Sequence, residues 1–177
     1  MTARLLGAWK RFRSRFWPAL LFDVVLICAL FFAIHSWQTR YLPIDEPAPE
    51  TVLALLDGSG IRSAIRPGEA GIVYFFAPWC FYCRSSIGNL QNLVKDGRVS
   101  WGTAIALDYG GIDEVQAFID ETGVTFPVLM GNAQTAADWQ IRGFPTYYVI
   151  DGQGEIHSRS VGYSTLAGMW FRNWLAR

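Results

Sequence analysis

The stretch Trp79-Cys80-Phe81-Tyr82-Cys83 decides how this chain is interpreted. It follows a short apolar run, residues 71–77, and it opens an amphipathic pattern typical of a helix. Two cysteines separated by two residues bring both sulfurs to one end of one helical turn, close enough to form a bond. The helix N-terminus stabilises a thiolate there through its unpaired N–H groups and its dipole. The stretch therefore predicts a redox site that cycles between dithiol and disulfide.

Two other interpretations of the pair are a static disulfide and half of a zinc site. A static bridge usually ties distant segments, because a short loop removes little entropy from the unfolded chain. A structural zinc ion needs about four ligands, and the remaining candidates, Cys28, His35 and His157, lie far off in the sequence. We therefore expect no metal, and no cofactor other than the Cys80–Cys83 disulfide itself.

The charge of the 177-residue chain is unevenly distributed. The first fifteen residues hold five Lys or Arg and no acid, whereas residues 41–177 hold nine Lys or Arg and fourteen Asp or Glu, a net charge of −5. A domain without a basic surface is not a nucleic-acid binder. The length allows one domain of moderate size.

A nearly all-apolar stretch of 22 residues, 16–37, is interrupted by Asp23 and His35. It is long enough to cross a hydrocarbon core of about 30 Å. Because a basic arm precedes it and acids follow, the positive-inside rule places the N-terminus in the cytoplasm. We expect a single-pass helix in the inner (cytoplasmic) membrane and a periplasmic or otherwise extracytoplasmic domain.

A cleaved signal peptide and a lipoprotein signal are the alternatives to an anchor. The apolar run ends in Ala33-Ile34-His35 rather than in a small-x-small cleavage site, and Ile27 before Cys28 is not small. We therefore expect the helix to be retained and Cys28 to carry no chemistry. Asp23 lies about two turns from the cytoplasmic edge, so its carboxylate is expected to snorkel toward the headgroups.

The remaining pattern divides the chain into segments. We expect a basic cytoplasmic arm over 1–15, a transmembrane helix over 16–37, an extended proline-rich spacer over 38–50 and one domain over 51–177. Within the domain, strands are expected at 51–56, 61–66, 72–76, 99–107, 126–130, 146–150 and 155–161, and helices from the cysteine pair to Lys95, around 113–122, over 133–140 and after a capping Ser164. This order predicts an α/β fold with a mixed central sheet and helices on both faces.

The order of parts over residues 47–177 resembles the thioredoxin fold and, more narrowly, the membrane-anchored thiol–disulfide oxidoreductases of the TlpA/ResA/DsbE type. Three motifs carry the resemblance: Ala77-Pro78-Trp79-Cys80-Phe81-Tyr82-Cys83-Arg84, Val124-Thr125-Phe126-Pro127-Val128, and Ile141 to Gly154, which contains Gly143-Phe144-Pro145-Thr146. In that family the proline of the third motif is cis and lies against the two sulfurs. Pro145 takes that position here, and the alternative is an ordinary turn before a strand.

The resemblance also implies a substrate surface. A cis proline donates no strand hydrogen bond, so the backbone of Phe144 is expected to pair with an extended substrate segment, as in strand addition. We expect Trp79, Phe81 and Tyr82 to complete this surface with Pro145. Relatives carry buried acids where this chain has Tyr74, Ser86 and Thr146. The sequence therefore offers no obvious base for Cys83 and leaves water or a tyrosine hydroxyl, of Tyr74 or Tyr82, as candidates.

The expected mechanism uses Cys80 as the nucleophile and Cys83 as the resolving thiol. The resemblance favours a reductase of protein disulfides that is fed by a DsbD/CcdA-like transmembrane electron carrier, with cytochrome c maturation as one setting. A disulfide oxidase or isomerase remains an alternative. A copper(I)-binding module using the same cysteine pair and a purely docking assembly factor are alternatives of other classes.

Overall fold

The computed structural model describes residues 16–177 and separates into two units, with the division between Arg40 and Tyr41. The first unit contains helix α2 (Phe16–Thr39). Among the described residues this is the one helix long and apolar enough to cross a membrane, over Pro18–Thr39. Such a helix near the N-terminus suggests a single-pass membrane anchor. The basic arm expected over 1–15 lies outside the described residues.

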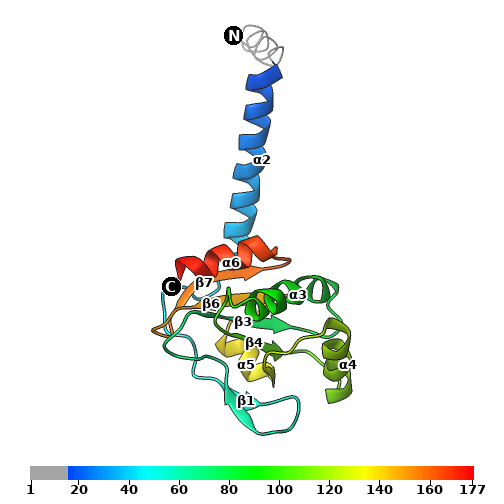
Figure 1. The fold of residues 1–177 in the computed structure, drawn as a ribbon. Coiled ribbons are helices and arrows are strands. Elements are labelled where there is room, and N and C mark those ends of the chain that lie inside the picture. Colours follow the sequence, from blue (N-terminus) through cyan, green and yellow to red (C-terminus); the bar gives the residue numbers. More distant parts are fainter. Residues whose placement is uncertain (1–15) are drawn as a thin grey trace. The chain divides into compact units, whose positions relative to one another are not determined.

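The second unit, Tyr41–Arg177, is built on a five-stranded sheet in the order β5-β4-β3-β6-β7 (Figure 1). The strands are β3 (Gly71–Phe76), β4 (Gly102–Ala106), β5 (Val128–Met130), β6 (Thr146–Ile150) and β7 (Ile156–Val161). Strands β3, β4 and β5 run parallel, whereas β6 pairs antiparallel with both β3 and β7. The sheet is therefore mixed, with the strand that precedes the cysteine pair at its centre.

Helices cover both faces of this sheet, which confirms the predicted mixed α/β sheet. Side chains alternate between the faces of a strand, so Tyr74 and Phe76 join one core cluster while Val73 and Phe75 join the other. The helices are α3 (Phe81–Lys95), α4 (Ile112–Thr122), α5 (Ala133–Asp138) and α6 (Leu166–Leu175). Residues of α3, α4 and α6 belong to the first cluster, and Trp139, directly after α5, belongs to the second.

A small antiparallel hairpin precedes the sheet. Its strands are β1 (Val52–Ala54) and β2 (Ile61–Ser63). The chain after β1 lies along the outer edge of β5, where Leu56 N donates to Val128 O at 2.9 Å and Leu55 bridges Leu129. The hairpin therefore shields one edge strand of the main sheet.

The segment predicted as an extended spacer is packed onto the globular unit from Leu42 onward. Leu42 and Ala48 are buried. The backbone N–H of Asp45 donates to Ile156 O at 2.8 Å, and that of Ala48 donates to Gly154 O at 3.0 Å. Pro47, which has no N–H to donate, bridges Glu155 at this outer position, where edge strands tolerate proline. Prolines and acids suggested a free linker, but Leu42 and Ala48 enter the core.

Candidate active site

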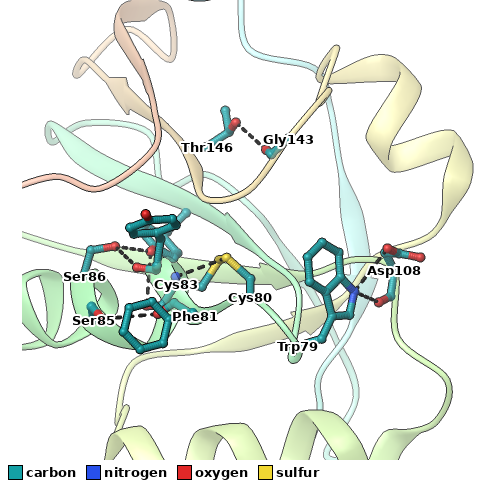
Figure 2. The surroundings of a disulfide bond; sticks show 11 residues. Trp79, Cys80, Phe81, Cys83, Ser85, Ser86, Asp108, Gly143 and Thr146 are labelled. Carbon is teal, nitrogen blue, oxygen red and sulfur yellow. Dashed lines mark hydrogen bonds between the residues drawn. A yellow bond between two sulfur atoms is a disulfide. The ribbon is translucent and has the colours of Figure 1, made fainter.

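The two cysteines lie where α3 begins, directly after the loop that follows the central strand β3. Cys80 is the N-cap of α3 and is bonded to Cys83, with their Cα atoms 5.2 Å apart (Figure 2). The backbone N–H of Cys83 points at the Cys80 sulfur, at 3.2 Å. A helix N-terminal N–H in this position stabilises a thiolate when the bond is opened. Both cysteines are buried, but Cys80 keeps 5% of its surface exposed and Cys83 none.

Arg84 directly follows the cysteine pair, and a positive charge there could stabilise a thiolate, but its guanidinium is already engaged. Its Nε donates to a carboxylate oxygen of Glu121 on α4 at 3.0 Å. Its guanidinium also lies over the ring of Phe118, 5.7 Å from the centroid. The stabilisation of a Cys80 thiolate therefore comes first from the helix N–H groups.

Aromatic residues flank Cys80 in the sequence and are exposed on the surface. Trp79, Phe81 and Tyr82 are all exposed, at 62%, 72% and 60%. The Trp79 indole N–H donates to the backbone oxygen of Asp108 at 3.1 Å and approaches its carboxylate at 3.2 Å (Figure 2). The Trp79 ring also meets the ring of Phe144 edge-on, with 5.9 Å between centroids. The surface predicted for substrate is thus an apolar collar whose tryptophan is held in place.

Asp108 is the contact that sequence reasoning missed. It lies in the loop after β4, and its φ of 50° puts it in the left-handed region. Aspartate is one of the few non-glycine residues that enter this region readily. The turn-rich sequence of the loop was visible, but nothing local linked it to a tryptophan 29 residues earlier.

The Phe144–Pro145 peptide bond is cis. Its neighbourhood is fixed by two hydrogen bonds: Gly162 N donates to Pro145 O at 2.8 Å, and the Thr146 hydroxyl donates to Gly143 O at 2.8 Å. Thr146 pairs with Phe75 near the end of β3, and the Phe144 ring contacts Trp79. The fold therefore brings the proline loop and the cysteine motif, 65 residues apart in sequence at Cys80 and Pro145, to one end of the sheet.

Behind Cys83 lie two hydroxyls at the positions where relatives were expected to carry acids. Tyr74 Oη and Ser86 Oγ are 2.6 Å apart, and both side chains are fully buried. Burial raises the pKa of Tyr74 well above its ordinary value, so the phenol is neutral at physiological pH. Tyr82, the other candidate base, is exposed on the collar. Within residues 16–177 no group of three or more His, Cys, Asp or Glu side chains is arranged to hold a metal ion.

Comparison with known proteins agrees with this geometry. The AhpC/TSA family matches residues 44–159. The thiol:disulfide interchange protein HelX of Rhodobacter capsulatus is 33% identical over 155 residues, covering 81% of this chain and 84% of HelX. The thiol–disulfide oxidoreductase ResA of Oceanobacillus iheyensis is 28% identical over 166 residues, covering 89% and 86%. A thioredoxin-family thiol:disulfide interchange protein from Chlorobium tepidum TLS superposes with a TM-score of 0.66 at 28% identity, over 74% of this chain and 95% of that structure.

Proposed function

Because the chain belongs to the AhpC/TSA family and is a thiol–disulfide oxidoreductase by its cysteine pair and its relatives, we propose that it works as a membrane-anchored, extracytoplasmic reductase of protein disulfides. The observation that carries the proposal is the asymmetry of the two sulfurs. Cys80, the N-cap of α3, keeps 5% of its surface exposed, and Cys83, one turn inside, keeps none. One sulfur is thus placed to meet a substrate and the other to complete the exchange.

The proposed reaction has two steps. The Cys80 thiolate attacks one sulfur of a substrate disulfide; a Cys80–substrate disulfide forms, and the other substrate sulfur leaves with the electron pair and takes up a proton. Cys83 then loses its proton and attacks the Cys80 sulfur, which releases the second substrate thiol. The substrate disulfide is reduced to two thiols, and the two protein thiols are oxidised to the disulfide between Cys80 and Cys83.

The substrate surface supports an extended peptide as partner. The exposed collar of Trp79, Phe81 and Tyr82 offers apolar contact, while the backbone of Phe144 beside the cis bond of Pro145 offers strand-like pairing. Substrate selection would therefore depend on apolar residues around a cysteine rather than on charge.

The apolar helix α2 supports a partner in the membrane. The helix suggests an anchor, and an anchor raises the effective concentration of the domain near such a partner. We propose that this partner is a DsbD/CcdA-like transmembrane carrier that returns electrons to the Cys80–Cys83 disulfide. The relatives' names describe thiol–disulfide interchange and leave the direction of electron flow to experiment.

The deciding experiment is the reduction potential of the cysteine pair, measured by equilibration with glutathione buffers. A reductase is expected nearer to about −270 mV than to about −120 mV. Alkylation of cells during growth should then trap the pair mostly as thiols. A potential near the oxidising end, with the pair trapped as a disulfide, would favour the alternative of a disulfide oxidase.

Cysteine variants test the roles of the two sulfurs. Cys80→Ser should abolish disulfide reduction, whereas Cys83→Ser should accumulate covalent substrate adducts on Cys80, visible on non-reducing gels. Cys28→Ser is the matched control, since Cys28 is the remaining free cysteine of the described residues and lies in α2. Full activity in Cys80→Ser would reject the assignment.

A further inference from the structure

The first turn of α3 is tied to the central strand by a short chain of hydrogen bonds. The Ser86 hydroxyl donates to the backbone oxygen of Tyr82 at 2.9 Å. Since the Ser86 proton is used in that bond, the Tyr74 hydroxyl donates its own proton to Ser86 Oγ, at 2.6 Å. The same Tyr74 oxygen lies 3.4 Å from the backbone oxygen of Cys83. Figure 2 shows Ser86 and Cys83 together on this turn, with Cys80 at its start.

The carbonyl that accepts from Ser86 belongs to Tyr82, and the carbonyl beside the Tyr74 oxygen belongs to Cys83, which carries the second sulfur. Cys80 stands outside the helix as its N-cap, and neither hydroxyl contacts it. The hydrogen bonds thus restrain the turn that carries Cys83. Cys80 is held instead by the bond from the Cys83 backbone N–H to its sulfur.

The restraint matters at one stage of the exchange. In the oxidised protein the disulfide itself holds the two sulfurs together. In the Cys80–substrate intermediate that bond is open, and the position of the Cys83 sulfur depends on the helix turn alone. A misplacement of about 1 Å in such a unimolecular step costs up to about 100-fold in rate.

We propose that Tyr74 and Ser86 are positioning residues for the second half of the exchange: they fasten the Tyr82–Cys83 turn to β3 and hold the Cys83 sulfur in line with the Cys80–substrate disulfide. This inference rests on the proposed function. In the step concerned, Cys83 loses its proton and its sulfur forms a bond to the Cys80 sulfur. The bond from Cys80 to the substrate breaks, and the substrate sulfur leaves with the electron pair and is protonated.

The surroundings of Tyr74 show how the positioning is achieved without a carboxylate. In the sheet, Tyr74 faces Ala104 of β4 and Tyr147 of β6. The Tyr147 hydroxyl accepts a hydrogen bond from Arg172 of α6 at 2.8 Å. The partners of the two hydroxyls are each other and the backbone oxygens of Tyr82 and Cys83, so the Tyr74–Ser86 pair is a neutral link.

The test separates the two steps in the full-length protein in detergent. Reduced protein is mixed with a disulfide-bonded peptide, and quenched-flow alkylation followed by mass spectrometry gives the rate of formation and the rate of decay of the Cys80–peptide adduct. Tyr74→Phe and Ser86→Ala should each leave formation within about twofold and slow decay by about tenfold, the effect of one lost buried hydrogen bond. The adduct should then accumulate transiently.

Tyr148→Phe is the matched control. Tyr148 is an equally buried tyrosine on the neighbouring strand β6, on the opposite face of the sheet, and its hydroxyl donates to Trp139 O at 2.6 Å. It removes a comparable hydrogen bond far from the cysteine turn and should change neither rate. An unchanged ratio of the two rates in Tyr74→Phe and Ser86→Ala, or an equal change in Tyr148→Phe, would overturn the inference. Failure of the wild-type protein to reduce the peptide disulfide at all would instead reject the proposed function.

Discussion

Gly71 opens the central strand at a point where the chain has room for no side chain. A Cβ atom there would collide with the indole ring of Trp101. Trp101 cannot move aside easily, because it is 3% exposed and its N–H donates to Glu69 O at 2.8 Å. A side chain at position 71 would therefore force Trp101 or the first residue of β3 to shift.

We expect Gly71→Ala to lower the free energy of unfolding by about 1–3 kcal/mol through overpacking. Gly88→Ala is the control: it lies inside α3, and a Cβ there meets nothing within 4 Å. Replacing a helical glycine by alanine should raise stability by about 0.5–1 kcal/mol. Guanidinium unfolding followed by tryptophan fluorescence measures both, and effects of the same sign would contradict the argument.

The buried tyrosines Tyr74 and Tyr148 make the free energy of unfolding depend on pH above about pH 10. Burial raises the pKa of both Tyr74 and Tyr148 above the ordinary value of 10.0. Below about pH 10 the phenols are protonated in both the folded and the unfolded chain, so the free energy of unfolding does not change with pH on their account. Above it the unfolded chain releases its protons first, so the free energy of unfolding falls as the pH rises toward the folded value.

The expected slope is about −1.4 kcal/mol per pH unit for each tyrosine. Tyr148→Phe removes one of the two, so its stability should fall less steeply than that of the wild-type protein. Urea unfolding at pH 9, 10 and 11 measures the slope. A variant that loses stability as steeply as the wild type would show that this phenol titrates alike in both states.

At the scale of elements, the sequence predicted what depends on neighbouring residues and missed what depends on distant ones. The i, i+3 spacing of the cysteines and the apolar run before them are local, so β3 and α3 were placed within a residue or two. Strand ends were less accurate: the strand expected over 99–107 is Gly102–Ala106, since its length is set by pairing with β3 and β5. The hydrogen bond between Tyr74 of β3 and Ser86 of α3 joins two elements, and no local sequence pattern predicts it.

The start of α6 shows the same limit. Ser164 was predicted as its cap, but the N-cap is Thr165, whose hydroxyl accepts from Gly168 N at 3.2 Å. Ser164 is instead buried, and its backbone oxygen accepts from the side chain of Asn89 at 2.9 Å. Both residue types cap helices well, so one position of shift could be decided only by the contact with α3.

We expect Thr165→Ala to reduce the free energy of unfolding by about 1 kcal/mol, because the N–H of Gly168 loses its acceptor. Thr165→Ser keeps a hydroxyl at the same place and should remain close to the wild type. Thermal unfolding followed by circular dichroism compares the three proteins. Equal destabilisation by the two substitutions would mean that the methyl group of Thr165, and not the cap, is what matters.

At the scale of the whole molecule, the residues just before position 51 matter most, because several of them pack onto the globular unit. Composition placed its start at residue 51, because the preceding stretch is rich in prolines and acids. The structure extends the unit back to Tyr41. The Tyr41 ring lies beneath the guanidinium of Arg142, 4.6 Å from the ring centroid, three residues before Pro145. The segment after the apolar helix is thus part of the folded body and reaches the loop that forms the active site.

This placement predicts that two neighbouring apolar residues of the segment differ sharply in their contribution to stability. Leu42 is 5% exposed within the core cluster that also contains Ile156, whereas Ile44 is 40% exposed. Leu42→Ala should lower the free energy of unfolding by about 2–5 kcal/mol, and Ile44→Ala by at most about 1 kcal/mol. Urea unfolding of the full-length protein in detergent measures the difference. A free spacer would make the two substitutions equally silent, since neither side chain would then lose buried contacts on unfolding.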